Sequence, residues 1–546
     1  MESTDTIAKA ACAACKQYKR KCDKALPCCS TCTRLHRECT YLDPAPRVTA
    51  EEEITLLRAR VEQLEKLVDN SIFTKVSSKP KTDNLSYIGG ETSGKAASNL
   101  YSSLFFLDQR YFTHLHRKQE PLLLPTTRAL AEILEPELGL PGGLCQLVSR
   151  YFDAVQGWMP VVSRMRMRRV LDRSIGEIKA DTAFLLSCMK LVLQDPQSQN
   201  FEDQSLYKAL KAEYLDLEQA GVQSLRLIQG GLMIAVYELG HGIYPAAYTT
   251  VGICARQAIS LGINNQEIPQ FLQPWPEWEE EIRVWWFVMM LDRHVTVGRE
   301  LRSLCTENPK KNMPLPADSE AWDQGVMAAP QRLYISSPMT VRSSSFARFA
   351  QAYNLLGRVI RHCDDQDQDL SFMLDELSTL HQATSSLLEV ARNESNEDLT
   401  LAMSICFVLG KSLADFSRAL MKLHKNFLHN SFYQGYADKA SEPRLASCIR
   451  QNNEHSFNVM RDTALQVVDF AQVLERCTVV VGISKTSPLI LHSLYRGAFW
   501  LSYLSATNRE DKFVAGRAII DRVLRALSVR WKLAGMPLFP NPRVCY

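Results

Sequence analysis

Six cysteines near the start of the chain are spaced as metal ligands. They form two copies of one unit, a Cys-x-x-Cys pair followed after six residues by a third cysteine, and the second copy begins seventeen residues after the first. Thiolates two residues apart can bind one tetrahedral ion from a single helical turn, which favours zinc. Six thiolates give two zinc ions four ligands each only if two sulfurs are shared. The spacing therefore predicts a binuclear zinc cluster bound by Cys12, Cys15, Cys22, Cys29, Cys32 and Cys39.

A seventh cysteine, Cys28, lies directly beside Cys29. Only Cys29 keeps both the pairing with Cys32 and the seventeen-residue repeat, so we expect Cys28 not to be a ligand. The first fifteen residues have neither a basic start followed by an apolar run nor a small-residue cleavage site, so they are not typical of a secretory signal. We therefore expect reduced thiols, and we expect the nine later cysteines, which lack metal-ligand spacing, to be small buried side chains.

Basic residues are concentrated around this cysteine block. Residues 9–40 hold eight Lys or Arg side chains against two acidic ones, a net charge of +6, although the whole chain carries only +3. Two zinc ions bound by six thiolates would carry about −2, so a charge of about +4 remains, which suits a phosphate backbone. A unit of about thirty residues is too small to fold on a hydrophobic core alone, so zinc must supply most of its folding free energy. The alternative is a zinc-stabilised interaction module that does not touch DNA.

The segment CAACKQYKRKCDKALPCCSTCTRLHREC, residues 12–39, resembles the DNA-binding domain of the fungal binuclear zinc-cluster regulators, the family of the yeast galactose regulator. Its cysteines satisfy every ligand position of the family pattern. The resemblance implies that Cys12 and Cys29 bridge the two zinc ions, and that Pro27 is the loop proline that is often cis in the family. It also implies that a short helix over residues 16–22 enters the major groove end-on.

The same resemblance assigns roles to the basic residues of this helix. Family members recognise CGG-type triplets with a basic residue three positions before the third cysteine, where this chain has Lys19. A lysine ammonium can donate to the O6 and N7 acceptors of guanine. Tyr18 stands where many members have a second basic residue. We expect Lys16, Arg20 and Lys21 mainly to contact phosphates, and the alternative for each is a solvated surface charge.

A heptad pattern follows the proline-bearing residues 42–50, which we expect to be a short linker. Apolar residues spaced 3, 4, 3 and 4 place β-branched side chains at a and leucine at d, which favours a parallel two-stranded coiled coil over residues 51–69. The alternative is a helix packed on the chain's own core, because the repeat lasts little more than two heptads. The seam residues are Ile54, Leu57, Val61, Leu64 and Val68.

A dimer helix behind the zinc-binding unit would place two identical DNA-binding units on two half-sites. Glu53 and Arg60 fall at g and Arg58 and Glu65 at e, where opposite charges attract across a parallel dimer. One unit alone contacts too few base pairs for useful specificity. We therefore predict a homodimer on double-stranded DNA, with the linker helping to set the half-site spacing.

Residues 70–100 are rich in Ser, Lys, Thr, Gly and Asn and predict a flexible connector. Residues 101–546 predict an all-α regulatory domain, because apolar side chains recur at intervals of three and four and alternating strand-like runs are scarce. No apolar run is long enough for a membrane span, and we expect none. Helices are predicted around residues 144–155, 183–193, 227–239, 247–262, 280–293, 345–361, 370–390, 400–424, 455–475, 487–504 and 515–533.

Three motifs within about residues 140–330 resemble the middle homology regulatory domain of the same fungal family. They are YFDAV before a proline, ARQA with LGI, and WW with LDR and GR, although Glu300 follows the last motif where the family usually has proline. From the residues alone, we expect the Trp pair and the Asp292-Arg293 dipeptide to be core anchors and a helix-end ion pair rather than a ligand site.

The remainder shows no GxSxG, HExxH or glycine-rich dinucleotide motif, so we do not expect an enzyme. Residues 364–377 mix acidic side chains, five of them through Asp375, with bulky ones, as activation segments do; a solvated loop entering an acidic helix start is the alternative.

The leading hypothesis is a nuclear, homodimeric regulator of RNA polymerase II transcription. Residues 9–41 would bind DNA through two zinc ions, and the helical domain would contact the transcription machinery or coactivators. Residues 16–24 also fit a nuclear-import signal. The second hypothesis is an enzyme or metabolite sensor carried by the helical part, which the zinc cluster only localises. Replacing Cys12 or Cys29 would abolish regulation under the first hypothesis but spare catalysis or ligand binding under the second.

Overall fold

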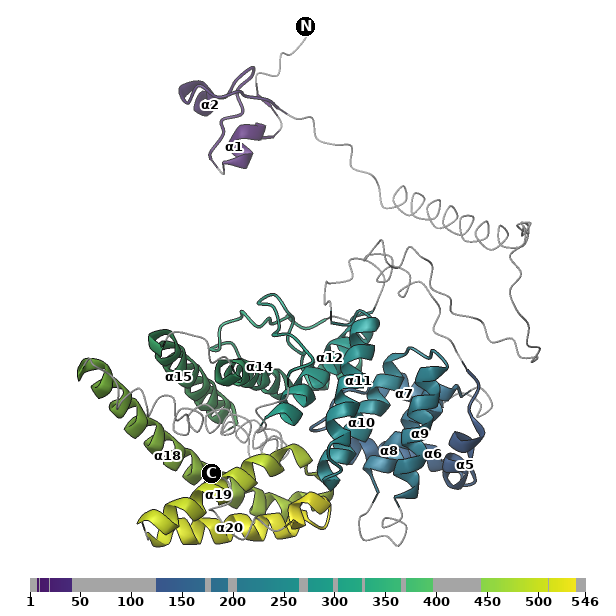
Figure 1. Ribbon diagram of the computed structural model, residues 1–546. Coiled ribbons are helices and arrows are strands. Elements are labelled where there is room, and N and C mark those ends of the chain that lie inside the picture. Colours follow the sequence, from purple (N-terminus) through teal and green to yellow (C-terminus); the bar gives the residue numbers. More distant parts are fainter. Residues whose placement is uncertain are drawn as a thin grey trace, which may run out of the picture. The chain divides into compact units, whose positions relative to one another are not determined.

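The computed structural model divides the chain into two compact units, residues 1–97 and 98–546 (Figure 1). The predicted coiled coil, the connector, the helix around residues 400–424 and Lys19 lie outside the residues that the structure describes. The described residues are 7–8, 10–18, 20–41, 124–171, 178–194, 204–264, 274–297, 303–326, 329–364, 370–395, 443–508 and 510–536.

The described part of the first unit contains two short helices, α1 (Ala13–Gln17) and α2 (Ser30–Arg34). The predicted helix over residues 16–22 is therefore wrong in its bounds. Helix α1 begins earlier because the Cys12 side chain caps it by accepting a hydrogen bond from the backbone N–H of Cys15. It ends at Gln17 because the chain then turns, and the backbone N–H of Arg20 donates to the Cys15 carbonyl at 2.9 Å.

The second unit is built from helices, which confirms the all-α prediction. In its described part, the only extended pairings are two isolated bridges, Pro125 with Lys179 and Pro314 with Tyr334. The helices are α5 (Arg128–Leu138), α6 (Gly143–Ala154), α7 (Arg164–Leu171), α8 (Ala180–Val192), α9 (Ser205–Gln219), α10 (Leu225–His241), α11 (Ala246–Ser260), α12 (Trp275–Thr296), α13 (Ser319–Gln324), α14 (Ser345–Asp364), α15 (Leu370–Ser395), α18 (Pro443–Val481), α19 (Leu491–Asn508) and α20 (Asp511–Leu527).

Each apolar stripe that falls on described residues coincides with a helix, whereas α5, α7, α9 and α13 were not predicted. The signal for α9 was present, because its buried residues Tyr207, Leu210, Tyr214 and Leu217 are spaced three and four apart. The other three are harder to detect: α5 contains Pro136, α7 is dominated by arginine, and α13 is a single short element.

Helix α10 lies at the centre of the second unit and is buried along almost its whole length. It packs on α8 and α11, and close approach requires glycine: a Cβ on Gly230 would lie 2.4 Å from the Phe184 ring. The hydrophobic core continues from α5 through α10 and α12 into α18, α19 and α20, which also pack together (Figure 1). Among the described helices, none combines the length and apolarity that a bilayer span needs.

Helix α12 carries the Trp pair and the Asp292-Arg293 dipeptide, all of them buried as expected for core anchors. The dipeptide does more than mark a helix end. The Asp292 carboxylate accepts hydrogen bonds from the backbone N–H groups of Cys305 and Thr306, at 3.0 and 2.8 Å. The Arg293 guanidinium donates to the Thr306 hydroxyl at 2.7 Å and to the Glu307 carbonyl at 3.0 Å. Both side chains therefore fasten the segment after α12 to the helix.

Candidate metal centre and nucleic-acid interface

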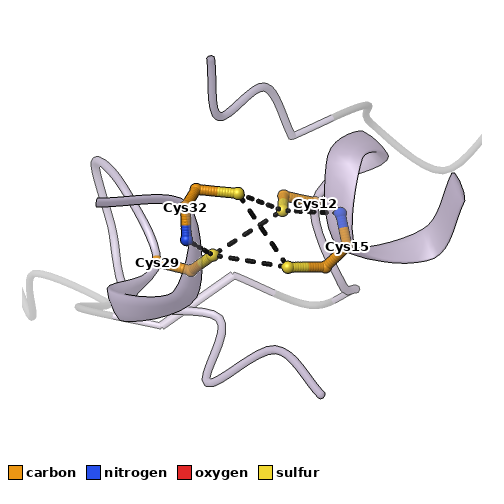
Figure 2. A group of neighbouring side chains, drawn as sticks. All are labelled: Cys12, Cys15, Cys29 and Cys32. Atoms are coloured by element: carbon orange, nitrogen blue, oxygen red, sulfur yellow. Dashed lines mark hydrogen bonds between the residues drawn. The ribbon is translucent and has the colours of Figure 1, made fainter. Parts of the chain in front are cut away.

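Four buried thiols meet in the first unit (Figure 2). The Sγ atoms of Cys12, Cys15, Cys29 and Cys32 all lie within 4.8 Å of one another. Cys12 lies 3.7 Å from Cys29 and 3.6 Å from Cys32, while Cys15 lies 3.7 Å from Cys29 and 3.9 Å from Cys32. A Zn–S bond of about 2.3 Å makes the edge of a tetrahedral ZnS4 group about 3.8 Å. These four distances are close to that edge length, as expected for thiols that bind zinc.

The third cysteine of each repeat lies at the border of this sulfur cluster. Cys22 has its Sγ 4.0 Å from that of Cys12, and the Cys39 Sγ accepts a hydrogen bond from the Cys29 backbone N–H at 3.4 Å. Cys28 is also half-buried against the cluster, but its thiol donates to the Cys29 backbone carbonyl at 3.9 Å. The six repeated cysteines are therefore gathered in one place, and they fit a binuclear site.

The sequence repeat is also a structural repeat. Cys29 caps α2 as Cys12 caps α1, because its side chain accepts from the Cys32 backbone N–H at 3.4 Å. The turn after each helix closes in the same way, and the Arg37 N–H donates to the Cys32 carbonyl at 3.0 Å just as Arg20 does to Cys15. Each Cys-x-x-Cys pair therefore presents both sulfurs from the first turn of a helix.

The buried thiols Cys15 and Cys32 differ in acidity from Cys22 and Cys39, the third cysteine of each repeat. Burial raises the pKa of Cys15 to about 12 and also raises the pKa of Cys32. The pKa of Cys22 is lowered to about 7, mainly by the Cys12 backbone N–H, and that of Cys39 is lowered to about 7 by the Cys29 backbone N–H. Without metal, Cys15 and Cys32 hold their protons, so zinc must displace these protons as it binds.

Contacts that sequence reasoning missed tie the two repeats together around the sulfurs. The Asp23 carboxylate accepts from the Ser30 backbone N–H at 3.2 Å, and the Thr31 hydroxyl donates to the Lys21 carbonyl at 3.1 Å. The Tyr41 hydroxyl donates to the Ala25 carbonyl at 2.9 Å and closes the unit at its end. No ligand-type pattern marks these residues in the sequence, because they act through loop geometry. The expected cis bond is present between Leu26 and Pro27.

The predicted DNA-contacting residues that the structure describes are all exposed. Lys16 lies on α1, and Arg20 and Lys21 follow in the turn that leads to Cys22. Tyr18, which comes directly after α1, is 54 % exposed, and the Arg37 guanidinium lies over its ring at 4.3 Å from the centroid. The described cationic residues of the first repeat are therefore exposed in the same small unit as the thiol cluster.

Comparisons with known proteins point in one direction. The fungal Zn(2)-Cys(6) binuclear cluster domain matches residues 10–48, and the fungal specific transcription factor domain matches residues 148–430. The first of these matches implies two zinc ions, which agrees with the sulfur geometry.

Curated relatives are named as transcription factors. Transcription factor BOA15 of Botryotinia fuckeliana is 41 % identical over 137 residues, which are 24 % of this chain and 76 % of that protein. The depudecin biosynthesis cluster-specific transcription activator DEP6 of Fusarium langsethiae is 40 % identical over 58 residues, and the C6 finger domain transcription factor hasF of Aspergillus fumigatus is 35 % identical over 77. Each of these two alignments covers 11 % of this chain and 10 % of the relative.

The second family match spans more than half of the chain and covers most of the described helical unit. These matches decide against the hypothesis that the helical part is an enzyme. The chain belongs to the fungal-specific transcription factor family and is a DNA-binding transcription regulator with an amino-terminal cluster of two zinc ions.

Proposed function

We propose that the chain acts in the nucleus as a homodimer, recognises paired CGG-type triplets and regulates RNA polymerase II transcription through its helical domain. The observation that supports this most strongly is that four buried sulfurs lie within 4.8 Å of one another in a small unit that also exposes the basic residues Lys16, Arg20 and Lys21. A metal-stabilised unit of this size can present a rigid cationic surface to DNA without a large core.

The proposed zinc ligands are the six repeated cysteines, with Cys12 and Cys29 shared between the two ions. Three sulfur–sulfur distances support this sharing. The Cys12 sulfur lies beside sulfurs of both repeats, namely Cys22 at 4.0 Å and Cys32 at 3.6 Å. The Cys29 sulfur lies 3.7 Å from Cys15 of the other repeat. Zinc bound here would fix the two helices relative to each other and hold the basic turn in place.

The proposed domain organisation follows the sequence. Residues 9–41 would bind DNA, residues 42–50 would link them to the coiled coil of residues 51–69, and residues 70–100 would connect to the helical domain of residues 101–546. Within the first unit, Lys19 would contact guanine, while Lys16, Arg20 and Lys21 would contact phosphates. The helical domain, including the middle homology region of about residues 140–330, would control activity or recruit coactivators.

Genome-wide mapping of the sites bound by the full chain tests the DNA preference. We expect paired CGG-like triplets at a fixed spacing. A matched pair of variants separates the two kinds of contact: Lys19→Ala should relax the triplet preference, whereas Lys16→Ala should weaken binding to all duplexes alike. Recovery of an unrelated motif, or a Lys19→Ala variant that keeps the triplet preference, would contradict the proposal.

Sedimentation of the full chain tests the dimer. The seam variant with both Leu57→Glu and Leu64→Glu should sediment as a monomer and lose its preference for paired over single triplets, because charge at d positions opposes the coiled coil. Replacing Lys66 with Ala, at the outward-facing f position of the same register, is the matched control and should stay dimeric. A monomeric wild-type chain would refute the homodimer but leave the zinc cluster and its DNA contacts standing.

A further inference from the structure

We propose that Tyr18 and Arg37 form a positioning pair in which the tyrosine ring holds the arginine against the DNA backbone. The inference deepens the proposed function and rests on it, since it adds one phosphate contact from the second repeat to those expected from the first. The Arg37 guanidinium lies 4.3 Å from the Tyr18 ring centroid, within the distance at which a cation is attracted to an aromatic face.

The pair joins the two halves of the zinc-binding unit. Tyr18 directly follows α1 and its backbone N–H donates to Ala14 at 3.1 Å, while the Arg37 N–H donates to the Cys32 carbonyl at 3.0 Å. The backbones of Tyr18 and Arg37 are therefore both held by hydrogen bonds close to cysteines of the cluster, and their side chains extend from these fixed positions. The contact carries a charge of the second repeat across to the turn after α1, which contains Arg20.

Stacking leaves the guanidinium able to bind an anion. A guanidinium stacks through its planar face, but its N–H groups point outward in the plane, where they can donate to phosphate oxygens. Tyr18 remains 54 % exposed and Arg37 is exposed too, so the pair lies at the surface. The acidic side chain Asp23 is committed elsewhere, because its carboxylate accepts from the Ser30 backbone N–H at the start of α2.

The pair also accounts for the aromatic residue within a basic segment. Tyr18 is an uncharged residue in the basic segment between Lys16 and Lys21, but the Arg37 guanidinium lies over its ring and places a positive charge at this position. An ordered arginine loses less side-chain freedom on binding than a mobile one, so the ring contributes to affinity by restricting the guanidinium before DNA arrives.

The test measures binding of the full chain to duplexes with and without paired CGG triplets over a range of salt concentrations. Arg37→Ala should make the negative slope of log K against log salt shallower by about 0.9, which corresponds to the loss of one phosphate contact. Arg34→Ala removes the same charge from an exposed position on α2 and should change the slope less. If the two variants change the slope equally, or if Arg37→Ala leaves it unchanged, the proposal that Arg37 contacts a phosphate is overturned.

The role of the ring is tested separately. Tyr18→Ala should weaken binding about two- to fivefold, the size of an exposed cation–π interaction, whereas Tyr18→Phe should keep wild-type affinity. In the Arg37→Ala background, Tyr18→Ala should have no further effect; an equal loss there would show that the ring acts without Arg37. All variants should retain two zinc ions per chain. If the wild type showed no triplet preference, the proposed function would fail, yet the slope comparison would still decide the role of Arg37.

Discussion

The indole rings of Trp158 and Trp531 meet edge to face, with centroids 6.5 Å apart and planes inclined at 82°. One follows α6 near the start of the helical unit and the other follows α20 near its end. The indole N–H of Trp531 also donates to the Thr486 carbonyl at 3.0 Å. The same ring packs so closely on α10 that a Cβ on Gly240 would lie 2.1 Å from it. The carboxyl-terminal helices are thus part of the same core as the region matched by the transcription factor family.

Replacing Trp531 with alanine should destabilise the helical unit by about 3–5 kcal/mol, because the indole is fully buried and its removal leaves a cavity among Trp158, Gly240 and Thr486. Urea unfolding followed by circular dichroism measures this loss. Val529→Ala, nearby but 43 % exposed, is the control and should change the free energy of unfolding little. A small effect of Trp531→Ala would mean that α18, α19 and α20 fold independently of the rest.

Removing Arg283 should also be costly, since it forms a fully buried ion pair with Glu279 at 2.8 Å and lies 4.2 Å from the Trp322 ring centroid. We expect Arg283→Ala to lower the free energy of unfolding by about 3–5 kcal/mol, because the Glu279 carboxylate would lose its main buried partner.

The double variant with Glu279→Gln and Arg283→Met should be less destabilised than Arg283→Ala alone, because it leaves neither member of the fully buried pair as an isolated charge. Arg128→Ala breaks a pair with Glu132 that is largely solvent-exposed and should cost at most about 1 kcal/mol. If the double variant has a lower free energy of unfolding than Arg283→Ala, the electrostatic explanation is contradicted and lost packing is favoured instead.

His241 should make the stability of the helical unit depend on pH. Burial, together with the nearby charges of Arg530 and Lys532, lowers its pKa to about 3, and the Lys532 backbone N–H donates to its Nδ1 at 3.4 Å. The unfolded chain binds the proton near pH 6.5 and the folded chain does not, so this contribution is complete above that pH and is lost as pH falls toward 3.

The wild type should therefore lose about 2 kcal/mol between pH 7 and pH 5 from this group. His241→Asn can still accept the hydrogen bond from Lys532 but does not titrate, so its unfolding free energy should fall less over the same range. Parallel pH profiles for the two proteins, measured by urea unfolding, would exclude the histidine as the cause.

Neighbouring cysteines should differ sharply in zinc binding. Cys28→Ser should keep two zinc ions per chain, because its thiol faces the Cys29 carbonyl rather than the inner sulfurs. Cys29→Ser should lose zinc and DNA binding together, because the Cys29 sulfur contacts both Cys12 and Cys15. Metal analysis of the purified variants gives the stoichiometry, and zinc loss in Cys28→Ser would require a different ligand set. Circular dichroism should show that both variants keep the helical unit, which carries its own core.

The sequence by itself determined the cysteine repeat, the exclusion of Cys28 from it and most of the helices. These features depend on short-range spacing: a Cys-x-x-Cys pair needs one helical turn, and an apolar stripe needs only a period near 3.6. The repeated spacing that includes Cys12 and Cys29 can therefore be recognised without knowledge of the fold.

Only the tertiary structure decided that Arg37 lies over Tyr18, that Asp292 and Arg293 fasten residues 305–307, and that Trp531 packs on Gly240. Each of these contacts joins segments separated by turns or whole helices, and any exposed arginine or buried tryptophan has many partners of suitable chemistry. The choice among them depends on how the helices pack and on which atoms that packing brings within a few ångströms, which no local pattern of residues encodes.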